Sequence, residues 1–236
     1  MFLNKLEGQM SEAVSTGIIL TLSGGLQDAY TYFYRGKVFA NAQTGNIIIF
    51  SHNIMNGSWH TAFRYLMPIL AFVAGIYVSE VIRGKYRDSE RIHWRQIVVV
   101  AEMVLLLLVG FLPNSMDLAA NAMVSFVCAM QVEAFRKMKG SAFASTMCIG
   151  NLRSATEMLY RYRQTRDREN LEKCLRYYGV ILFFAVGAGA GSFLVPLFAE
   201  KTIWFSCILL VFAFGIMFVK ENHHETVEAG GTTGGK

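Results

Sequence analysis

Long runs of apolar residues alternate with short polar connections along most of the chain. Six runs come close to the roughly 17–25 residues that a helix needs to cross a hydrocarbon core; they lie at 13–34, 60–82, 96–113, 117–135, 177–198 and 202–219. A seventh run at 38–55 is shorter and carries polar side chains in its first half. The pattern predicts an all-α integral membrane bundle of six transmembrane helices. Two short segments that contain Gly-Asn, 38–55 and 143–160, complete it.

Composition supports this class. Hydrophobic residues make up 53% of the 236 residues and charged residues only 17%, below the roughly 25% of a typical soluble domain. These values exclude a disordered chain, a collagen-like fibre and a secreted disulfide scaffold. Four cysteines without metal-ligand spacing are expected to be free, buried hydrophobes.

Position explains the net charge of +5. Most Lys and Arg residues fall in two loops, 83–95 and 136–176. Basic loops stay cytoplasmic, so six spans predict a bacterial inner-membrane protein with both termini in the cytoplasm and anionic lipid headgroups at these loops. Eight spans would separate the two loops and are disfavoured; seven would place the N-terminus outside. Nucleic acid is not an expected partner, and a homo-oligomer remains an open alternative.

The chain contains a weak internal repeat. Gly45-Asn46 recurs as Gly150-Asn151, Asp28-Ala29 as Glu133-Ala134, and Gly75 corresponds to Gly187. We therefore divide the chain into a cytoplasmic segment 1–12, membrane repeats 13–113 and 114–220, and a disordered tail 221–236. Three spans in each repeat predict halves of opposite topology, the plan of many transporters, whose binding sites lie near the midplane.

The segment 38–55 has two interpretations. Non-helical backbone at membrane depth is tolerated only where protein or water covers it. Asn41, Gln43, Thr44 and Asn46 would satisfy its freed backbone groups, and Gly45 would permit a bend, so we favour a buried, re-entrant segment. An interfacial amphipathic helix is the alternative.

Residues 24–46 resemble the YoaK-like family of bacterial membrane proteins. The resemblance rests on Gly25-Leu26-Gln27-Asp28-Ala29 and on the stretch from Phe39 to Thr44-Gly45-Asn46, and it extends over most of 10–220. It implies a multi-pass inner-membrane location and no particular activity. The second copy departs from the first, because Ile149 stands where the first copy has Thr44.

Acids inside the apolar runs are the sharpest candidates for chemistry. A carboxylate in a span costs at least about 2.5–3.5 kcal/mol at the bilayer centre and normally faces the bundle interior or water. Asp28, next to Gln27, is the candidate proton or cation site, unless it is hydrated at the interface and paired with Arg35. Glu102 stands alone in an apolar run, and Glu133 is expected to form an interfacial ion pair with Arg136.

No enzyme motif, cofactor fingerprint or metal-ligand cluster is present in the sequence. The expected function is a small-solute or ion transporter or channel, coupled to protons through Asp28, with an unknown substrate. Gln27, Asn41, Gln43, Thr44, Gly45, Asn46 and Glu102 complete the expected binding residues. The alternative is a non-transporting scaffold or sensory subunit that presents the basic loop 136–176, and an intramembrane enzyme is a weaker third.

Overall fold

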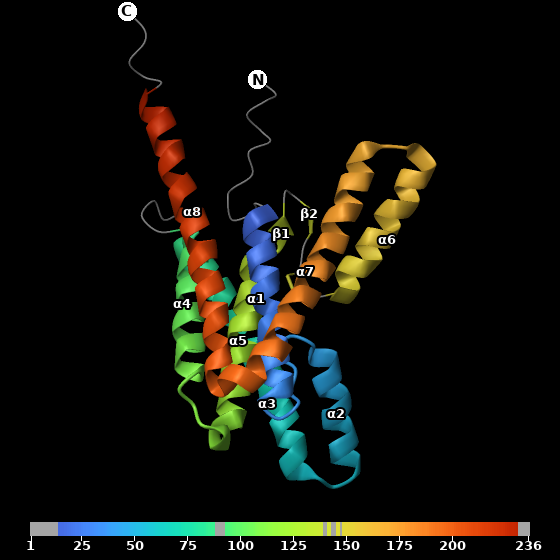
Figure 1. The fold of residues 1–236 in the computed structure, drawn as a ribbon, viewed down its shortest axis with the longest axis vertical. Coiled ribbons are helices and arrows are strands. Elements are labelled where there is room, and N and C mark those ends of the chain that lie inside the picture. The colour runs from blue at the N-terminus through green and yellow to red at the C-terminus, as the bar shows by residue number, and fades with distance from the viewer. Residues whose placement is uncertain (1–13, 88–92, 139–140, 143–144, 147, 231–236) are drawn as a thin grey trace, which may run out of the picture.

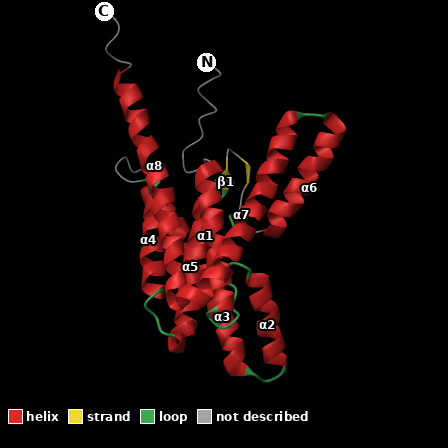
Figure 2. Ribbon diagram, in the orientation of Figure 1, coloured by secondary structure: helices red, strands yellow, loops and turns green. Residues whose placement is uncertain are grey.

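The protein folds as an all-helical bundle (Figure 2). The computed structural model describes residues 14–87, 93–138, 141–142, 145–146 and 148–230. Within this part of the chain the α-helices are α1 (Val14–Phe33), α2 (Gln43–Met55), α3 (Trp59–Tyr86), α4 (Trp94–Val109), α5 (Asp117–Ala134), α6 (Cys148–Thr165), α7 (Arg168–Phe198) and α8 (Trp204–Gly230). The 3-10 turns η3 (Asn114–Met116) and η4 (Ala199–Ile203) precede α5 and α8, and two-residue strands β1 (Lys137–Met138) and β2 (Ser141–Ala142) form a small antiparallel pair.

Each of the six predicted apolar runs overlaps one long helix: α1, α3, α4, α5, α7 and α8. By length and composition, three described segments can cross a membrane, namely Trp59–Tyr86, Asn114–Ala134 and Arg168–Met217. The third includes both α7 and the start of α8. These segments, and the many apolar side chains exposed on the outside of the bundle, agree with the predicted class of a membrane protein.

The helices pair in two equivalent sets (Figure 1). Helix α1 packs against α7 and α8, and α5 packs in the same way against α3 and α4. The hairpin α2–α3 extends to the lower end of the view, whereas the hairpin α6–α7 extends to the upper end. The start of α1 and the end of α8 both lie at the upper end.

Glycines allow the closest of these helix contacts. A Cβ on Gly187 of α7 would overlap the carbonyl oxygen of Leu22 on α1, and a Cβ on Gly75 of α3 would overlap that of Phe126 on α5. Gly75 and Gly187 were matched in the sequence repeat, and they occupy equivalent places in the two helix pairs. Small residues let helix backbones approach closely in membranes, so these glycines serve packing.

Several predicted boundaries were wrong. Helix α6 does not end at residue 160 but runs to Thr165, stabilised by the ion pair between Arg161 and Glu157 at 2.7 Å. Helix α7 starts well before residue 177, because the Asp167 side chain caps it by accepting from the N–H of Glu169.

The predicted tail and segment ends also need correction. Helix α8 continues to Gly230, so most of the tail 221–236 is helical; residues 221–229 contain no Gly or Pro that would end a helix. The segment 1–12, residues 143, 144 and 147 of the second Gly-Asn segment, and residues 231–236 lie outside the described residues.

The packing role of Gly187 can be tested against Gly189, two residues along the same helix. Gly187→Ala is expected to destabilise the protein by about 1–3 kcal/mol, because the added methyl group must displace the α1 backbone. Thermal unfolding of purified protein in detergent measures the effect. Gly189→Ala is the matched control and should have no destabilising effect, since nothing lies within 4 Å of a Cβ there. Equal effects of both substitutions would contradict the close-contact interpretation.

Candidate functional site

The chain turns back into the bundle after α1. Gly36 and Lys37 adopt positive φ angles of 84° and 61°, which reverse the direction of the backbone. Residues 38–42 then run without helical structure, with Val38 and Ala40 fully buried and Asn41 only 7% exposed. Helix α2 starts from this buried point and leads out again. Residues 38–42 are therefore covered by protein, as the re-entrant interpretation requires, while Asn46 is the buried residue of α2. The position of this segment relative to the membrane stays a prediction.

Asn41 connects residues 38–42 to Asp28. The backbone N–H of Asn41 donates to Asp28 Oδ1 at 2.8 Å, and the Asn41 side-chain amide donates to the carbonyl oxygen of Gly24 at 3.3 Å. Asp28 itself is buried. The carboxylate therefore faces the bundle interior, as predicted, and holds non-helical backbone in place.

The polar residues at the start of α2 support the loop instead of touching Asp28. The Asn46 amide donates to the carbonyl oxygen of Phe39 at 2.7 Å, and its oxygen accepts from the N–H of Phe39 at 3.1 Å. Gln43 donates to the carbonyl oxygen of Ala40 at 2.8 Å. Gly45 leaves room for the Phe39 ring, whose Cδ2 would lie 3.0 Å from an added Cβ.

Thr44 points away from this arrangement and is exposed on the outside of the helix. Of the predicted residues in 41–46, Asn41 thus reaches Asp28, whereas Gln43, Gly45 and Asn46 shape the loop. Sequence patterning does not separate these roles, because the first turn of a helix points its successive side chains in different directions.

Gln27 connects three helices at the centre of the bundle. Its amide nitrogen donates to Ser23 Oγ at 2.9 Å and to Glu102 Oε1 on α4 at 3.1 Å. Its amide oxygen accepts from the Cys128 thiol of α5 at 2.8 Å. All four residues are at most 1% exposed. Glu102 is therefore brought together with Gln27, and Cys128 is a member of the site that the sequence analysis treated as an inert hydrophobe.

A second hairpin reaches the same region from the other end. Gln131 of α5 donates to Ser145 Oγ at 2.9 Å and to the carbonyl oxygen of Leu20 at 3.3 Å. A Cβ on Gly24 would overlap the methyl group of Thr146 and would lie 4.0 Å from the Asn41 amide nitrogen. The segments that precede α2 and α6 therefore meet on α1 at Gly24.

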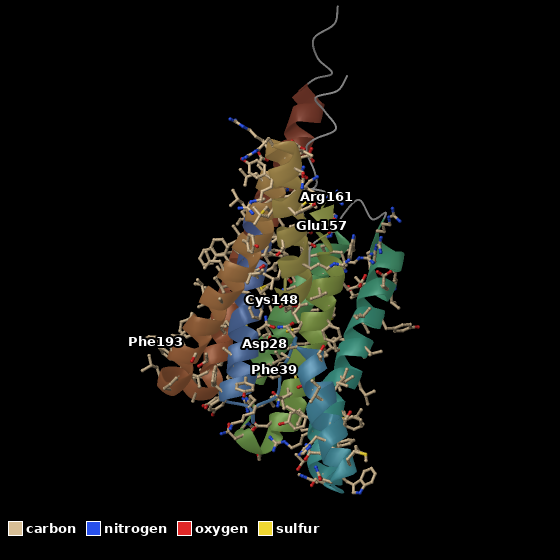
Figure 3. All side chains as sticks on the ribbon, turned by 90° about the vertical axis from the view of Figure 1, so that its right-hand side faces the viewer. Asp28, Phe39, Cys148, Glu157, Arg161 and Phe193 are labelled. Carbon is tan, nitrogen blue, oxygen red and sulfur yellow. The ribbon has the colours of Figure 1, made fainter. Side chains whose placement is uncertain are left out.

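Figure 3 shows Asp28, Phe39 and Cys148, the first residue of α6, close together at mid-height. We name the residues gathered here the central polar cluster: Gln27, Asp28, Asn41, Glu102, Cys128, Gln131 and Ser145. Gln131 and Ser145 were not predicted. A polar amide inside the apolar run 117–135 was the available signal for Gln131.

Some atoms of this cluster have no hydrogen-bond partner. Asn41 Oδ1, Glu102 Oε2 and Gln131 Oε1 are buried and unpartnered, as are the hydroxyl oxygens of Ser125 and Ser206. Within the described part of the chain, no Lys or Arg forms an ion pair with Asp28 or Glu102. A buried polar group without a partner is costly, so these oxygens are the unsatisfied acceptors of the cluster and its surroundings.

Arg35 does not pair with Asp28, so that alternative is wrong. The fully buried guanidinium turns to the lower end of the bundle, where it forms an ion pair with Asp117 at 3.0 Å. It also donates to Tyr30 Oη at 2.7 Å and to the carbonyl oxygen of Leu112 at 2.8 Å. Arg35 therefore fixes the end of α1 to the start of α5 and leaves the Asp28 carboxylate without a cationic neighbour.

The remaining predicted acids lie at the opposite end. Glu133 pairs with Arg136 at 3.0 Å, which confirms the expected ion pair, and Glu80 pairs with both Arg83 and Arg136. Trp94 lies between the side chains of Arg83 and Arg95, an arrangement typical of a membrane–water boundary. No group of three or more His, Cys, Asp or Glu side chains suited to a metal occurs among the described residues.

Long apolar helices around a polar centre indicate a helical membrane protein. A family model described as "Protein of unknown function (DUF1275)" matches residues 16–216, and the chain belongs to this family. The match agrees with the resemblance to the YoaK-like family. Comparisons with curated proteins and with solved structures gave no match.

The structural role of Asn46 leads to a prediction. Asn46→Asp keeps the acceptor for Phe39 N–H but removes the donor to the Phe39 carbonyl oxygen, and is expected to destabilise the protein by about 1–3 kcal/mol. Thermal unfolding in detergent measures this change. Thr44→Val, two residues away and exposed, is the control and should stay near wild type. A neutral Asn46→Asp variant would contradict the role of this side chain in holding the hairpin.

Proposed function

We propose that the chain is an inverted repeat of six membrane-crossing helices and two re-entrant hairpins, placed in the bacterial inner membrane. The equivalent pairing of α1 with α7 and of α5 with α3 supports the repeat. The α2–α3 and α6–α7 hairpins enter from opposite ends of the bundle (Figure 1). The exposed basic residues of α6, together with Arg83 and Arg136, gather at the upper end, which we assign to the cytoplasm.

The helix contacts suggest a register for this repeat. Gly187 meets Leu22 where Gly75 meets Phe126, and Gly191 meets the Leu26 carbonyl where the Ser79 hydroxyl donates to that of Met130. In this register Gln27 of α1 corresponds to Gln131 of α5. Asp28 then corresponds to Val132, so the match of Asp28 with Glu133 in the sequence is displaced by one residue.

In this arrangement the protein transports a small solute or ion through the central polar cluster. The observation that carries the proposal is the meeting of two non-helical segments, at Asn41 before α2 and at Thr146 before α6, on α1 beside buried, unpartnered polar atoms. Transporters place their sites where discontinuous helices meet near the midplane. Asp28 is the proposed point of proton or cation exchange, because its carboxylate accepts a hydrogen bond from the backbone N–H of Asn41, in the segment before α2.

A non-transporting scaffold is the second candidate, and the surface of α6 favours it. Only Asn151 and Ala155 of this helix are buried, and its arginines are exposed (Arg153, Arg161 and Arg163). Figure 3 shows Arg161 and Glu157 towards the upper end, away from Asp28. This face suits anionic lipid headgroups or an acidic cytoplasmic partner. We propose no enzymatic activity for either candidate.

The topology can be tested with single cysteines in a variant that lacks the four native ones. A cysteine replacing Asn56, between α2 and α3, should react with a membrane-impermeant maleimide added to whole cells. A cysteine replacing Arg166, between α6 and α7, should react only after the membrane is permeabilised. Both sites are exposed, so labelling of both from the same side would contradict the inverted arrangement.

The transport role of Asp28 can be tested in proteoliposomes that contain a pH-sensitive dye. Inward gradients of small cations, amino acids and sugars are imposed one at a time, and internal pH is followed. We expect wild type to show proton-linked flux above empty liposomes for at least one solute, and Asp28→Asn to lower it at least 10-fold while inserting normally.

Glu157→Gln, at an exposed position on α6, is the matched control and should retain wild-type flux. Unchanged flux in Asp28→Asn would contradict the role of Asp28. Absence of wild-type flux across the whole panel would contradict transport and favour the scaffold.

A further inference from the structure

We propose that the central polar cluster binds one small monovalent cation, either an alkali metal ion or an ammonium-type ion, beside Glu102 and Asn41. This inference rests on the proposed function and names its substrate or coupling ion. It follows from three features of the cluster: the kind of atoms left open, the absence of a protein cation, and the unequal contributions of the two halves.

The open atoms are acceptors. The Asn41 and Gln131 amide nitrogens already donate hydrogen bonds, to the carbonyl oxygens of Gly24 and Leu20. What remains is Asn41 Oδ1, Gln131 Oε1 and Glu102 Oε2. An amide or carboxylate oxygen accepts hydrogen bonds and binds cations, but it repels an anion. The site is therefore built for a species that is positive or donates protons.

The cluster also lacks a positive charge of its own. Arg35 is fully buried, but its guanidinium donates hydrogen bonds to Asp117, Tyr30 and backbone carbonyl oxygens at the lower end of the bundle. Glu102 is fully buried and accepts a hydrogen bond from the Gln27 amide at Oε1. A buried carboxylate that is neither paired nor coordinated is strongly unfavourable. Such a group otherwise takes up a proton, so we propose that a bound cation replaces that proton and supplies the compensating charge.

The ligand set fits a single positive charge better than two. Ca²⁺ takes six to eight oxygen ligands, and Mg²⁺ demands near-ideal octahedral geometry and gives up water reluctantly. Here Asp28 Oδ1 is already engaged by the N–H of Asn41, and Glu102 offers one free oxygen. One open carboxylate oxygen, on Glu102, together with the neutral amide oxygens of Asn41 and Gln131 suits an ion of a single positive charge.

The two halves of the proposed repeat do not contribute equally. Cys207 of α8 donates to the carbonyl oxygen of Met103 on α4 at 3.7 Å, which places these two residues opposite each other. In this register Glu102 corresponds to Ser206, and Asp28 corresponds to Val132. Both acids thus come from the first half, so we expect one cation site in each chain instead of two related sites.

Binding can be measured on purified full-length protein in detergent, independently of flux. Thermal unfolding is followed in chloride salts of Na⁺, K⁺, NH₄⁺, methylammonium and the bulky N-methylglucamine at constant ionic strength. The expected result is a Tm that rises to saturation with one or more small cations and does not rise with N-methylglucamine. Calorimetric titration with the stabilising cation should give one site per chain.

Glu102→Gln should lower the affinity of the protein for this cation at least 10-fold. Glu157→Gln, at an exposed position, should leave the affinity unchanged. If Glu102→Gln does not fold, Asn41→Leu provides the second test, because it removes an acceptor without changing charge. A preference for alkali ions indicates coordination, whereas a preference for NH₄⁺ and methylammonium indicates hydrogen-bond donation.

Two results would overturn the proposal: no saturable effect with any of these cations, or an effect that follows the anion when chloride is replaced. Cation binding without flux would contradict transport and leave the site intact. Flux without cation binding would contradict this site and leave transport intact.

Discussion

The requirement that every polar backbone group find a partner away from water governs this structure. Residues 38–42 bring non-helical backbone into the middle of the bundle, where such groups go unpaired at high cost. The Asn46 side chain pairs both backbone groups of Phe39, accepting from its N–H and donating to its carbonyl oxygen. The Asp28 carboxylate accepts from the backbone N–H of Asn41. Asp28 is thus both a structural acceptor and a candidate functional group. Neutralising its carboxylate would weaken the hydrogen bond that holds the backbone of Asn41 in place.

Close helix contacts leave little space around Asp28 and Asn41. The α1 backbone lies directly against α7 at Gly187, and Gly24 leaves room for Thr146 from the second hairpin. Because the helices pack this closely, the Cys128 thiol of α5 can donate a hydrogen bond to the Gln27 side chain of α1. A change in the position of the segment before α2 or before α6 would therefore alter the hydrogen bonds of the central polar cluster directly.

The two hairpins share a plan but differ in chemistry. The first brings Asn41 to a carboxylate, whereas the second brings Ser145 to the neutral side chain of Gln131. Helix α2 has one buried residue and α6 has two, so these two helices are held mainly by α3 and α7, against which they pack. Asp28 and Glu102 make the first side of the cluster acidic, whereas the exposed arginines of α6 give the second hairpin a positively charged surface.

The sequence by itself determined the helical membrane class and the six long helices, because apolar runs of sufficient length are local patterns. It singled out Asp28 and Glu102 as isolated acids within those runs, while their burial was decided by the tertiary structure. It also matched Gly75 with Gly187. It did not predict that Gln27 would contact Glu102 and Cys128, that Thr44 would point outward, or that Arg35 would choose Asp117 over Asp28. Those outcomes depend on the rotation of each helix and on contacts between residues far apart in the chain. A one-residue change of register turns a side chain by about 100° around its helix, and only tertiary packing sets that register.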